Sequence, residues 1–164
     1  MRVLIVGGVA AGMSAATRLR RLREDAEIVV FEAGENVSYA NCGLPYFVSD
    51  VISHRDALLL QTPESLWRRF RLEVRTNTRV IAIDRASQTV TAVNGLTGEE
   101  FTDSYDYLVL ATGARPRTLD VPGGARALAL RDVADADRLK AAAGNAKTAV
   151  VVGAGFVGVE VAEN

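Results

Sequence analysis

Short apolar runs alternate with longer mixed segments along the first part of the chain. Residues 2–6 (RVLIV) stop at a glycine pair, and residues 27–31 (EIVVF) stop at Glu32. Runs of this length and composition are typical of parallel strands buried on both faces. Residues 10–23 between them are rich in Ala, Leu and Arg and contain no Pro, which predicts an amphipathic helix. Its predicted apolar face consists of Ala15, Leu19 and Leu22.

The pattern after residue 40 changes between helical and strand-like periods. Residues 41–51 predict a short helix or turn, and Thr62 followed by Pro63 predicts a capped helix that runs to about Phe70. Residues 132–143 predict another helix, which ends at Gly144. Further strands are predicted at residues 72–75, 80–83, 89–93, 100–102, 107–111 and 148–152.

This order of elements predicts an α/β fold. A strand, a glycine turn, a helix and a second strand within about thirty residues form a βαβ unit. We therefore expect a Rossmann-like domain with a β-hairpin or meander insertion over residues 1–115, a connector over 116–146, and the start of a second Rossmann domain over 147–164. Because the last unit has only part of a helix and no return strand, we expect the sequence to be the N-terminal part of a longer protein.

Composition excludes several classes of function. The net charge of the 164 residues is −1, so no bulk attraction to nucleic acid or to an anionic membrane is expected. No apolar run has membrane-spanning length, and the first residues do not resemble a signal peptide. The single cysteine excludes an intrachain disulfide and a multi-cysteine metal site, and we predict no metal. A lone cysteine also favours a reducing, cytoplasmic location.

The segment GAGFVG matches the full pattern G-x-G-x-x-G between a predicted strand and a predicted helix. Its first glycine allows a tight turn, its second lets the backbone approach a pyrophosphate, and its third lets helix and strand pack closely. The alternative is a glycine-rich turn without a ligand. The predicted nucleotide-binding residues are Gly153, Gly155, Gly158 and Glu160.

The segment GGVAAG is a less regular version of the same turn, because Val9 stands at the middle position. Glu32 supports the assignment, since it lies 25 residues after Gly7 at the end of the next strand, where a carboxylate can accept ribose hydroxyls. Two such turns indicate two dinucleotides and electron transfer between them. The predicted contacts in this turn are Gly7, Gly8, Val9, Ala10, Ala11 and Gly12.

The two turns, with the Ala-Thr-Gly segment at residues 111–113, resemble the pyridine-nucleotide–disulfide oxidoreductase superfamily over essentially the whole chain. The resemblance implies FAD at the first turn and NAD(P)H at the second. It also implies a homodimer for the full-length protein. The further FAD contacts that it implies are Val80, Ala111, Thr112, Gly113 and Arg131. For Val80 a strand-core role, and for Arg131 a surface role beside a helix, are equally open.

The segment SYANCGLPY, residues 38–46, resembles the single-cysteine branch of that superfamily, above all the coenzyme A-disulfide reductases. The resemblance implies that Cys42 cycles between a thiolate and a mixed disulfide with CoA. A lone cysteine is often an inert buried residue, but Cys42 precedes Gly43 and a helix-like segment whose N–H groups can stabilise a thiolate. Related branches remain alternatives: NADH oxidases and peroxidases, which use a sulfenic acid, and CoA-dependent persulfide reductases.

CoA carries several phosphates, so its site needs cations, and arginine donates two parallel hydrogen bonds to phosphate. Arg18 and Arg21 share a helix face with Ser14. The alternative is a solvated basic face. The resemblance implies CoA contacts at Ser14, Arg18, Arg21, Ser38, Asn41, Arg69 and Arg71. A different class of function, a non-enzymatic nucleotide-binding module, is an alternative for the 164-residue piece taken alone.

Overall fold

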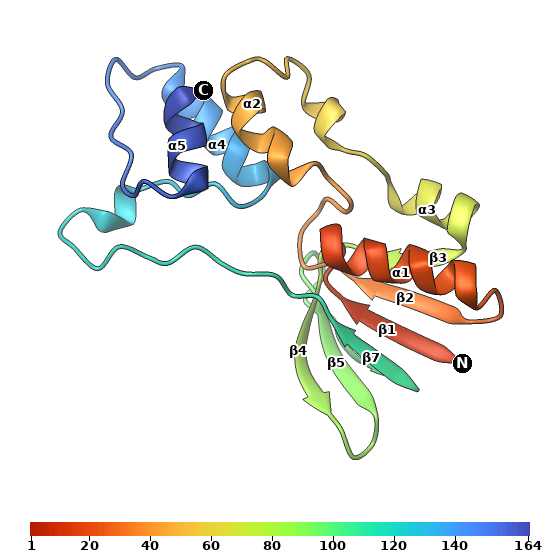
Figure 1. Ribbon diagram of the computed structural model, residues 1–164. Coiled ribbons are helices and arrows are strands. Elements are labelled where there is room, and N and C mark those ends of the chain that lie inside the picture. The colour runs from red at the N-terminus through yellow and green to blue at the C-terminus, as the bar shows by residue number, and fades with distance from the viewer. The chain divides into compact units, whose positions relative to one another are not determined.

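The computed structural model describes residues 1–164 and divides them into two compact units. The first unit contains residues 1–39 and 61–113, and the second contains residues 40–60 and 114–164. Figure 1 labels elements of both units.

A four-stranded parallel sheet forms the centre of the first unit. Its strands are β1 (Arg2–Val6), β2 (Glu27–Phe31), β3 (Leu72–Arg75) and β7 (Tyr107–Leu110), in the order β3-β2-β1-β7. Val3 of β1 lies opposite Ile28 of β2 and Tyr107 of β7. The predicted parallel strands and the Rossmann-like architecture are thereby confirmed.

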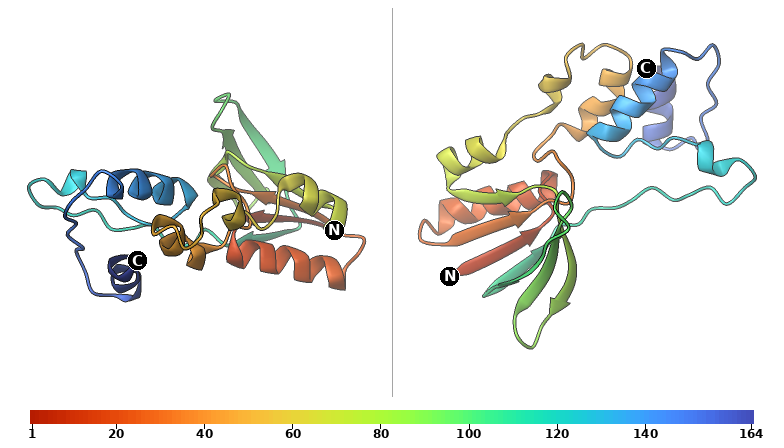
Figure 2. Two further views of the ribbon diagram at one scale, coloured as in Figure 1. Left: turned by 90° about the horizontal axis from the view of Figure 1, so that it is seen from above. Right: turned by 180° about the vertical axis from the view of Figure 1, so that it is seen from behind.

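Two helices, α1 (Ala10–Leu22) and α3 (Pro63–Phe70), pack on one face of this sheet (Figure 2). Val3 and Ile5 of β1 and Ile28 and Val30 of β2 point toward them, since alternate residues of a strand face the same side. The apolar cores of the strands are almost completely buried. This packing explains why β1 and β2 are apolar throughout: both of their faces are covered.

The other face of the sheet is covered by an antiparallel meander of β4 (Thr78–Asp84), β5 (Thr89–Asn94) and β6 (Glu100–Ser104). Leu4, Val29 and Phe31 of the sheet pack there against Val90 of β5. The rings of Phe31 and Phe101 lie 6.3 Å apart between centroids. The predicted hairpin insertion is therefore a three-stranded layer that shares an apolar core with the parallel sheet.

The start of α3 and the buried face of α1 can be compared with the sequence predictions. In α3, Thr62 and Ser65 form a reciprocal capping box around Pro63, which confirms the predicted helix start. In α1 the predicted apolar face is partly wrong, because Leu22 is 61% exposed, whereas Met13 and Ala16 are buried. The buried face of the helix therefore consists of Gly12, Met13 and Ala16, and Ala15 and Leu19 pack beside it.

The second unit consists of helices and connecting segments. Its α-helices are α2 (Leu44–Val48), α4 (Val133–Ala143) and α5 (Phe156–Glu163), and its 3₁₀ turns are η1 (Asn41–Gly43), η2 (Arg55–Leu58) and η3 (Gly124–Arg126). Helices α2 and α4 pack together: the Lys140 ammonium lies 4.2 Å from the centre of the Phe47 ring and forms an ion pair with Asp50. A second ion pair joins Arg55 to Asp137 at 3.0 Å.

The predicted strand at residues 148–152 does not form. These residues have no strand assignment, and the side chain of Val150 is 85% exposed. A strand requires a neighbouring strand to pair its backbone groups, and no strand in residues 1–164 lies beside this segment. No helix of the structure combines the length and the apolar character needed to cross a membrane.

Candidate functional site

The first glycine turn connects β1 to α1 and requires glycine at two positions. Gly7 has φ +109°, and a Cβ there would lie far inside the van der Waals radius of the Ala111 carbonyl oxygen. A Cβ on Gly12 would overlap the Gly7 carbonyl oxygen in the same way. Gly7 N–H donates to the Phe31 carbonyl at 2.8 Å, which anchors the turn at the carboxyl ends of the strands. Ligands of open α/β sheets bind at this edge.

Helix α1 leaves its first N–H groups available at this turn. Val9 is the N-cap residue, and no side chain accepts a hydrogen bond from the first turn of the helix. Four N–H groups at a helix start lack intrahelical partners, and together with the helix dipole they favour an anion. A diphosphate fits these donors. Val9 itself is partly buried, so its side chain does not stand free in front of them.

Glu32 lies beside the same turn, as its spacing predicted. Its carboxylate accepts hydrogen bonds from Gly8 N–H at 2.7 Å and from Gly34 N–H at 2.8 Å. These bonds fix the rotamer of the Glu32 side chain, which directly follows β2. A carboxylate has about four lone-pair sites, so two remain for hydroxyl donors such as those of a ribose.

The other residues predicted for FAD lie in different surroundings. Ala111 follows β7 and donates its N–H to the Val6 carbonyl at 2.8 Å, next to the first glycine turn, while Thr112 and Gly113 are exposed. Val80 of β4 packs against the core between sheet and meander. Arg131 belongs to the second unit, where its Nε donates to the Ala114 carbonyl at 2.5 Å.

Cys42 lies within η1, directly before Gly43 and the start of α2, and it is exposed. Gly43 N–H donates to the Ala40 carbonyl at 2.9 Å, which closes the turn. Gly43 is buried, and a Cβ there would approach Leu58 at 3.0 Å and Ile52 at 3.2 Å. The sequence Cys-Gly therefore places an accessible thiol next to a residue small enough to pack against Leu58 and Ile52. Asn41, in the same turn, is also exposed.

Ser38 belongs to the first unit and lies at the first glycine turn. Its N–H donates to the Gly8 carbonyl at 2.9 Å, and its φ is +49°. A non-glycine residue with positive φ is uncommon, and such strain concentrates at functional sites. The structure thus holds Ser38 in an unusual conformation beside the predicted nucleotide-binding turn.

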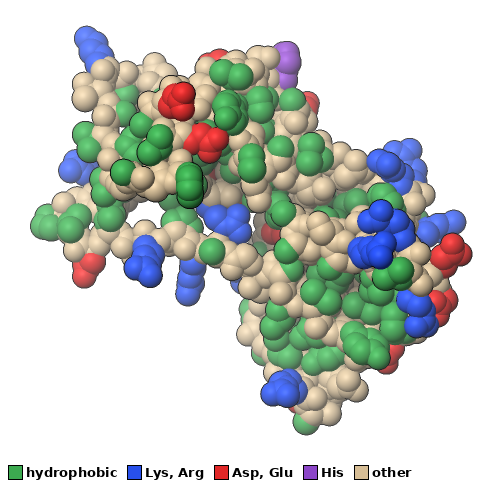
Figure 3. All heavy atoms as spheres, in the orientation of Figure 1, with side chains coloured by type: hydrophobic (Ala, Val, Ile, Leu, Met, Phe, Trp, Pro, Cys, Tyr) green, Lys and Arg blue, Asp and Glu red, His purple; other side chains and the backbone are tan.

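Basic side chains gather over α1 and α3, as Figure 3 shows. Ser14, Arg18 and Arg21 are exposed on α1, and Arg69 and Arg71 are exposed at the end of α3. The Arg69 guanidinium lies 5.3 Å from the Phe70 ring centre, and that of Arg71 lies 5.8 Å from the Trp67 ring centre. None of these four arginines forms an ion pair with a carboxylate of the chain.

Arg20 has a role that sequence reasoning missed. Its guanidinium donates to the Phe70 carbonyl at 2.7 Å and to the Arg71 carbonyl at 3.0 Å. Phe70 is the last residue of α3 and Arg71 is its C-cap, and carbonyls at a helix end have no partners within the helix. The acceptors are backbone atoms some fifty residues away, so no pattern of side chains in the sequence distinguishes Arg20 from its exposed neighbours.

The second glycine turn, at the start of α5, repeats the local geometry of the first. Gly153 has φ +107°, and a Cβ on Gly158 would overlap the Gly153 carbonyl oxygen, as for Gly7 and Gly12. Gly155 is the N-cap of α5, which has no capping side chain, and nothing lies within 4 Å of its Cβ position. The middle glycine therefore leaves open space in front of the helix N–H groups, as a pyrophosphate requires.

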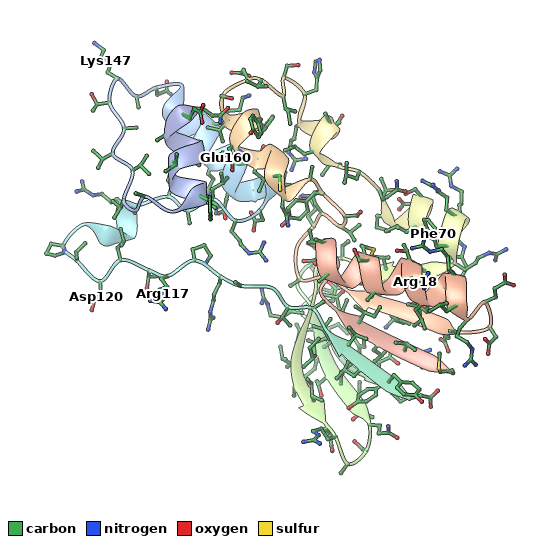
Figure 4. All side chains as sticks on the ribbon, viewed as in Figure 1. Arg18, Phe70, Arg117, Asp120, Lys147 and Glu160 are labelled. Atoms are coloured by element: carbon green, nitrogen blue, oxygen red, sulfur yellow. The ribbon has the colours of Figure 1, made fainter.

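Glu160 of α5 has a partner within the second unit. The hydroxyl of Tyr46 donates to Glu160 Oε1 at 3.2 Å. Figure 4 labels Glu160, whose side chain points from α5 toward α2. The hydrogen bond to Glu160 and the charge of that carboxylate raise the pKa of Tyr46 above its ordinary value. Tyr46 had not been singled out from the sequence.

Comparison with known proteins gives a consistent result over the whole chain. The family model described as pyridine nucleotide-disulphide oxidoreductase matches residues 1–164. The chain is 40% identical, over 99% of its length, to the coenzyme A disulfide reductase of Staphylococcus haemolyticus, of which it covers 37%. The chain therefore spans little more than a third of the length of this curated relative.

Two solved structures are similar in fold and sequence. Reduced Bacillus anthracis CoADR-RHD is 45% identical with a TM-score of 0.93, and the match covers 99% of this chain and 30% of that one. A NAD-dependent persulfide reductase from A. fulgidus is 40% identical with a TM-score of 0.92, and the match covers 99% and 31%.

Proposed function

Because the chain belongs to the pyridine nucleotide-disulphide oxidoreductase family, we propose that the full-length protein reduces a CoA-linked disulfide with electrons from NAD(P)H, through FAD and Cys42. The observation that carries this proposal is the exposed single cysteine in the turn before α2, in a chain that is 40% identical over its length to a coenzyme A disulfide reductase. Cys42 is therefore the proposed redox-active residue.

FAD is assigned to the first glycine turn and NAD(P)H to the second. Gly7 to Gly12, Glu32 and Ala111 to Gly113 would hold FAD, with Val80 and Arg131 as further contacts. The tight turns and the uncapped N–H groups of α1 and α5 fit a diphosphate at each. Bound FAD would supply the path by which electrons from NAD(P)H reach sulfur. The residues assigned to NAD(P)H are Gly153, Gly155, Gly158 and Glu160.

Cys42 would act as the nucleophile of thiol–disulfide exchange. Its thiolate attacks one sulfur of a CoA disulfide, the S–S bond of the substrate breaks, and one CoA thiolate leaves and takes a proton from solvent. Cys42 then carries the second CoA as a mixed disulfide, whose reduction by two electrons releases that CoA and restores the thiolate. Access governs this exchange, and Cys42 is exposed.

The phosphates of CoA would bind the unpaired cations of the first unit. Arg18 and Arg21 on α1, with Arg69 and Arg71 on α3, carry charges that no carboxylate of the chain neutralises. Arginine suits phosphate because its planar fork donates two parallel hydrogen bonds. Ser14, Ser38 and Asn41 would add hydroxyl and amide groups to the same substrate.

The persulfide reductase from A. fulgidus favours a second candidate function, since it is as similar to this chain as the curated relative is. In that case CoA would stay attached to Cys42, and the acceptor would be a persulfide sulfur. We also propose that the full-length protein is a cytoplasmic homodimer. Its FAD domain would include residues 1–115, its connector residues 116–146, and its NAD(P) domain would begin with residues 147–164.

The test is the intact mass of the full-length protein with and without dithiothreitol. We expect an addition of one CoA that dithiothreitol removes and that Cys42→Ser abolishes. A control, Ser53→Ala, changes an exposed hydroxyl in the same unit and should keep the adduct. If the protein instead gains one oxygen atom at Cys42 after peroxide and no CoA, the oxidase or peroxidase alternative replaces the proposal. Assays with CoA disulfide and a CoA persulfide then separate the two candidates.

A further inference from the structure

Tyr46 is a polar aromatic residue to which the proposed function assigns no role. It lies in α2, one helical turn after Cys42, and its hydroxyl donates to Glu160 Oε1 at 3.2 Å. Glu160 lies in α5, two residues after the last glycine of the second turn. The bond therefore joins the segment that carries the proposed redox cysteine to the helix that carries the proposed NAD(P)H turn.

Helices α2 and α5 lie side by side, and a second hydrogen bond joins them. Ser49 Oγ donates to Asn164 Oδ1 at 3.2 Å, one turn further along both helices. Ser49 Oγ also lies 3.1 Å from the Tyr46 carbonyl. Two bonds of similar length thus connect the same helices, and only the Tyr46 bond reaches a residue assigned to nucleotide binding. Removing each bond in turn, by Tyr46→Phe and by Ser49→Ala, therefore separates an effect on nucleotide binding from an effect on helix packing.

The electrostatics keep the Tyr46 hydroxyl a donor. Its hydrogen bond to Glu160 is the largest cause of its raised pKa, the charge of Glu160 is the next, and the charges of Glu163 and Cys42 act in the same direction. The phenol therefore stays protonated at neutral pH and holds one carboxylate oxygen of Glu160. The other oxygen, Oε2, accepts no hydrogen bond in the structure, so it remains available for a donor of a ligand.

We propose that Tyr46 is a positioning residue that holds the Glu160 carboxylate in the orientation that binds the nicotinamide nucleotide. The inference rests on the proposed function, since it assumes that the second glycine turn binds NAD(P)H. A glutamate side chain has three rotatable bonds, and fixing it in the free protein removes part of the entropy cost of binding. NAD(P)H offers amide and hydroxyl donors, which the free Oε2 accepts.

The experiment compares Tyr46→Phe with Ser49→Ala in the full-length, FAD-loaded protein. Tyr46→Phe removes only the hydroxyl, and Ser49→Ala removes the other bond between the helices. Titration calorimetry with NAD⁺ and NADP⁺ gives the Kd without turnover. We expect Tyr46→Phe to raise the Kd of the preferred nucleotide about 2- to 10-fold, the range of one net hydrogen bond. Ser49→Ala should change it less than twofold.

Steady-state kinetics and a double variant separate positioning from a structural role. Tyr46→Phe should raise KM for NAD(P)H and leave KM for CoA disulfide unchanged. In a Glu160→Ala background, Tyr46→Phe should have no further effect on the Kd, because the partner through which it acts is gone. Equal losses in both backgrounds, or equal losses with both variants, would overturn the inference in favour of general helix packing.

Failure of this inference can be told from failure of the proposed function. A wild-type protein that binds neither NAD⁺ nor NADP⁺ contradicts the assignment of the second glycine turn. A wild-type protein that binds one of them, beside a Tyr46→Phe variant with the same Kd, contradicts only the role of Tyr46.

Discussion

Arg18 and Arg20 lie two residues apart on α1, and of these two only Arg20 has hydrogen-bond partners for its side chain. Arg20 satisfies the last carbonyls of α3, whereas Arg18 is exposed on the face that also carries Ser14. An arginine side chain therefore has a structural role at position 20 and is available for a ligand at position 18. Figure 4 labels Arg18 on α1.

We expect opposite outcomes for Arg18→Ala and Arg20→Ala in the full-length protein. Arg18→Ala should raise KM for CoA disulfide about 10- to 150-fold, the value of a charge-assisted hydrogen bond to phosphate, and leave the free energy of unfolding within about 0.5 kcal/mol. Arg20→Ala should lower the free energy of unfolding by about 1–3 kcal/mol, because it leaves two helix-end carbonyls without donors.

Denaturant unfolding and substrate kinetics on both variants check this prediction. Arg23→Ala is the control, since Arg23 pairs only with the exposed Asp25 beside it. An Arg18→Ala variant with normal KM for CoA disulfide would show that the basic face of α1 is a solvated surface that does not bind CoA.

At the scale of elements, Asp103 of β6 joins the meander to the parallel sheet. One of its carboxylate oxygens accepts from Arg2 of β1 at 2.7 Å, and the other accepts from Arg75 of β3 at 3.0 Å. The Arg75 guanidinium also lies 5.4 Å from the centre of the Phe31 ring. The side chain of Asp103 is only 11% exposed, so its two partners replace most of the water it loses.

We expect Asp103→Ala to lower the free energy of unfolding by about 1.5–3 kcal/mol, because it removes a mostly buried carboxylate that accepts from two guanidinium groups. Both groups keep a more exposed partner, since Arg2 also pairs with Glu27 and Arg75 with Glu73. Asp25→Ala is the matched control, since its pair with Arg23 is exposed, and it should cost less than about 1 kcal/mol. Urea unfolding of the full-length protein measures both. Equal costs for the two variants would show that the Arg2–Asp103–Arg75 cluster is no more stabilising than a surface ion pair.

At the scale of the whole molecule, the segment between α4 and the end of α5 leaves large apolar side chains in water. Phe156 is 97% exposed, and Val150 and Val152 are more than two-thirds exposed. An apolar surface of this kind needs a cover, because each buried large side chain contributes about 1.5–3 kcal/mol. The chain covers 37% of the relative from S. haemolyticus, so that relative is far longer than the matched part.

We therefore expect residues 1–164 expressed alone to bind FAD weakly or not at all, to show no NADH-dependent turnover, and to bind a hydrophobic dye such as ANS. Phe156→Ser should reduce the dye signal of the piece, whereas Leu96→Ser, an exposed apolar residue of the β5–β6 turn, should change it little. Purification of the 164-residue piece with stoichiometric FAD and turnover would contradict the prediction, and so would a dye signal that does not depend on Phe156.

Much of the fold and part of the site follow from local patterns. Both glycine turns, the capping box at Thr62 and the position of Glu32 beside Gly8 agree with the sequence prediction. These features depend on residues within one βαβ unit, where spacing and backbone geometry restrict the outcome. The ligand roles of Cys42 and of the arginines stay predictions, because they depend on molecules that bind from outside the chain.

The sequence by itself determined which segments are strands and helices in the first unit, and where glycine is required, because period, caps and positive φ are properties of neighbouring residues. Only the tertiary structure decided that Arg20 supports α3, that Leu22 is exposed, that residues 148–152 remain unpaired, and that Tyr46 meets Glu160. Each of these depends on which surfaces meet across tens of residues, and local propensity contains no information about that choice.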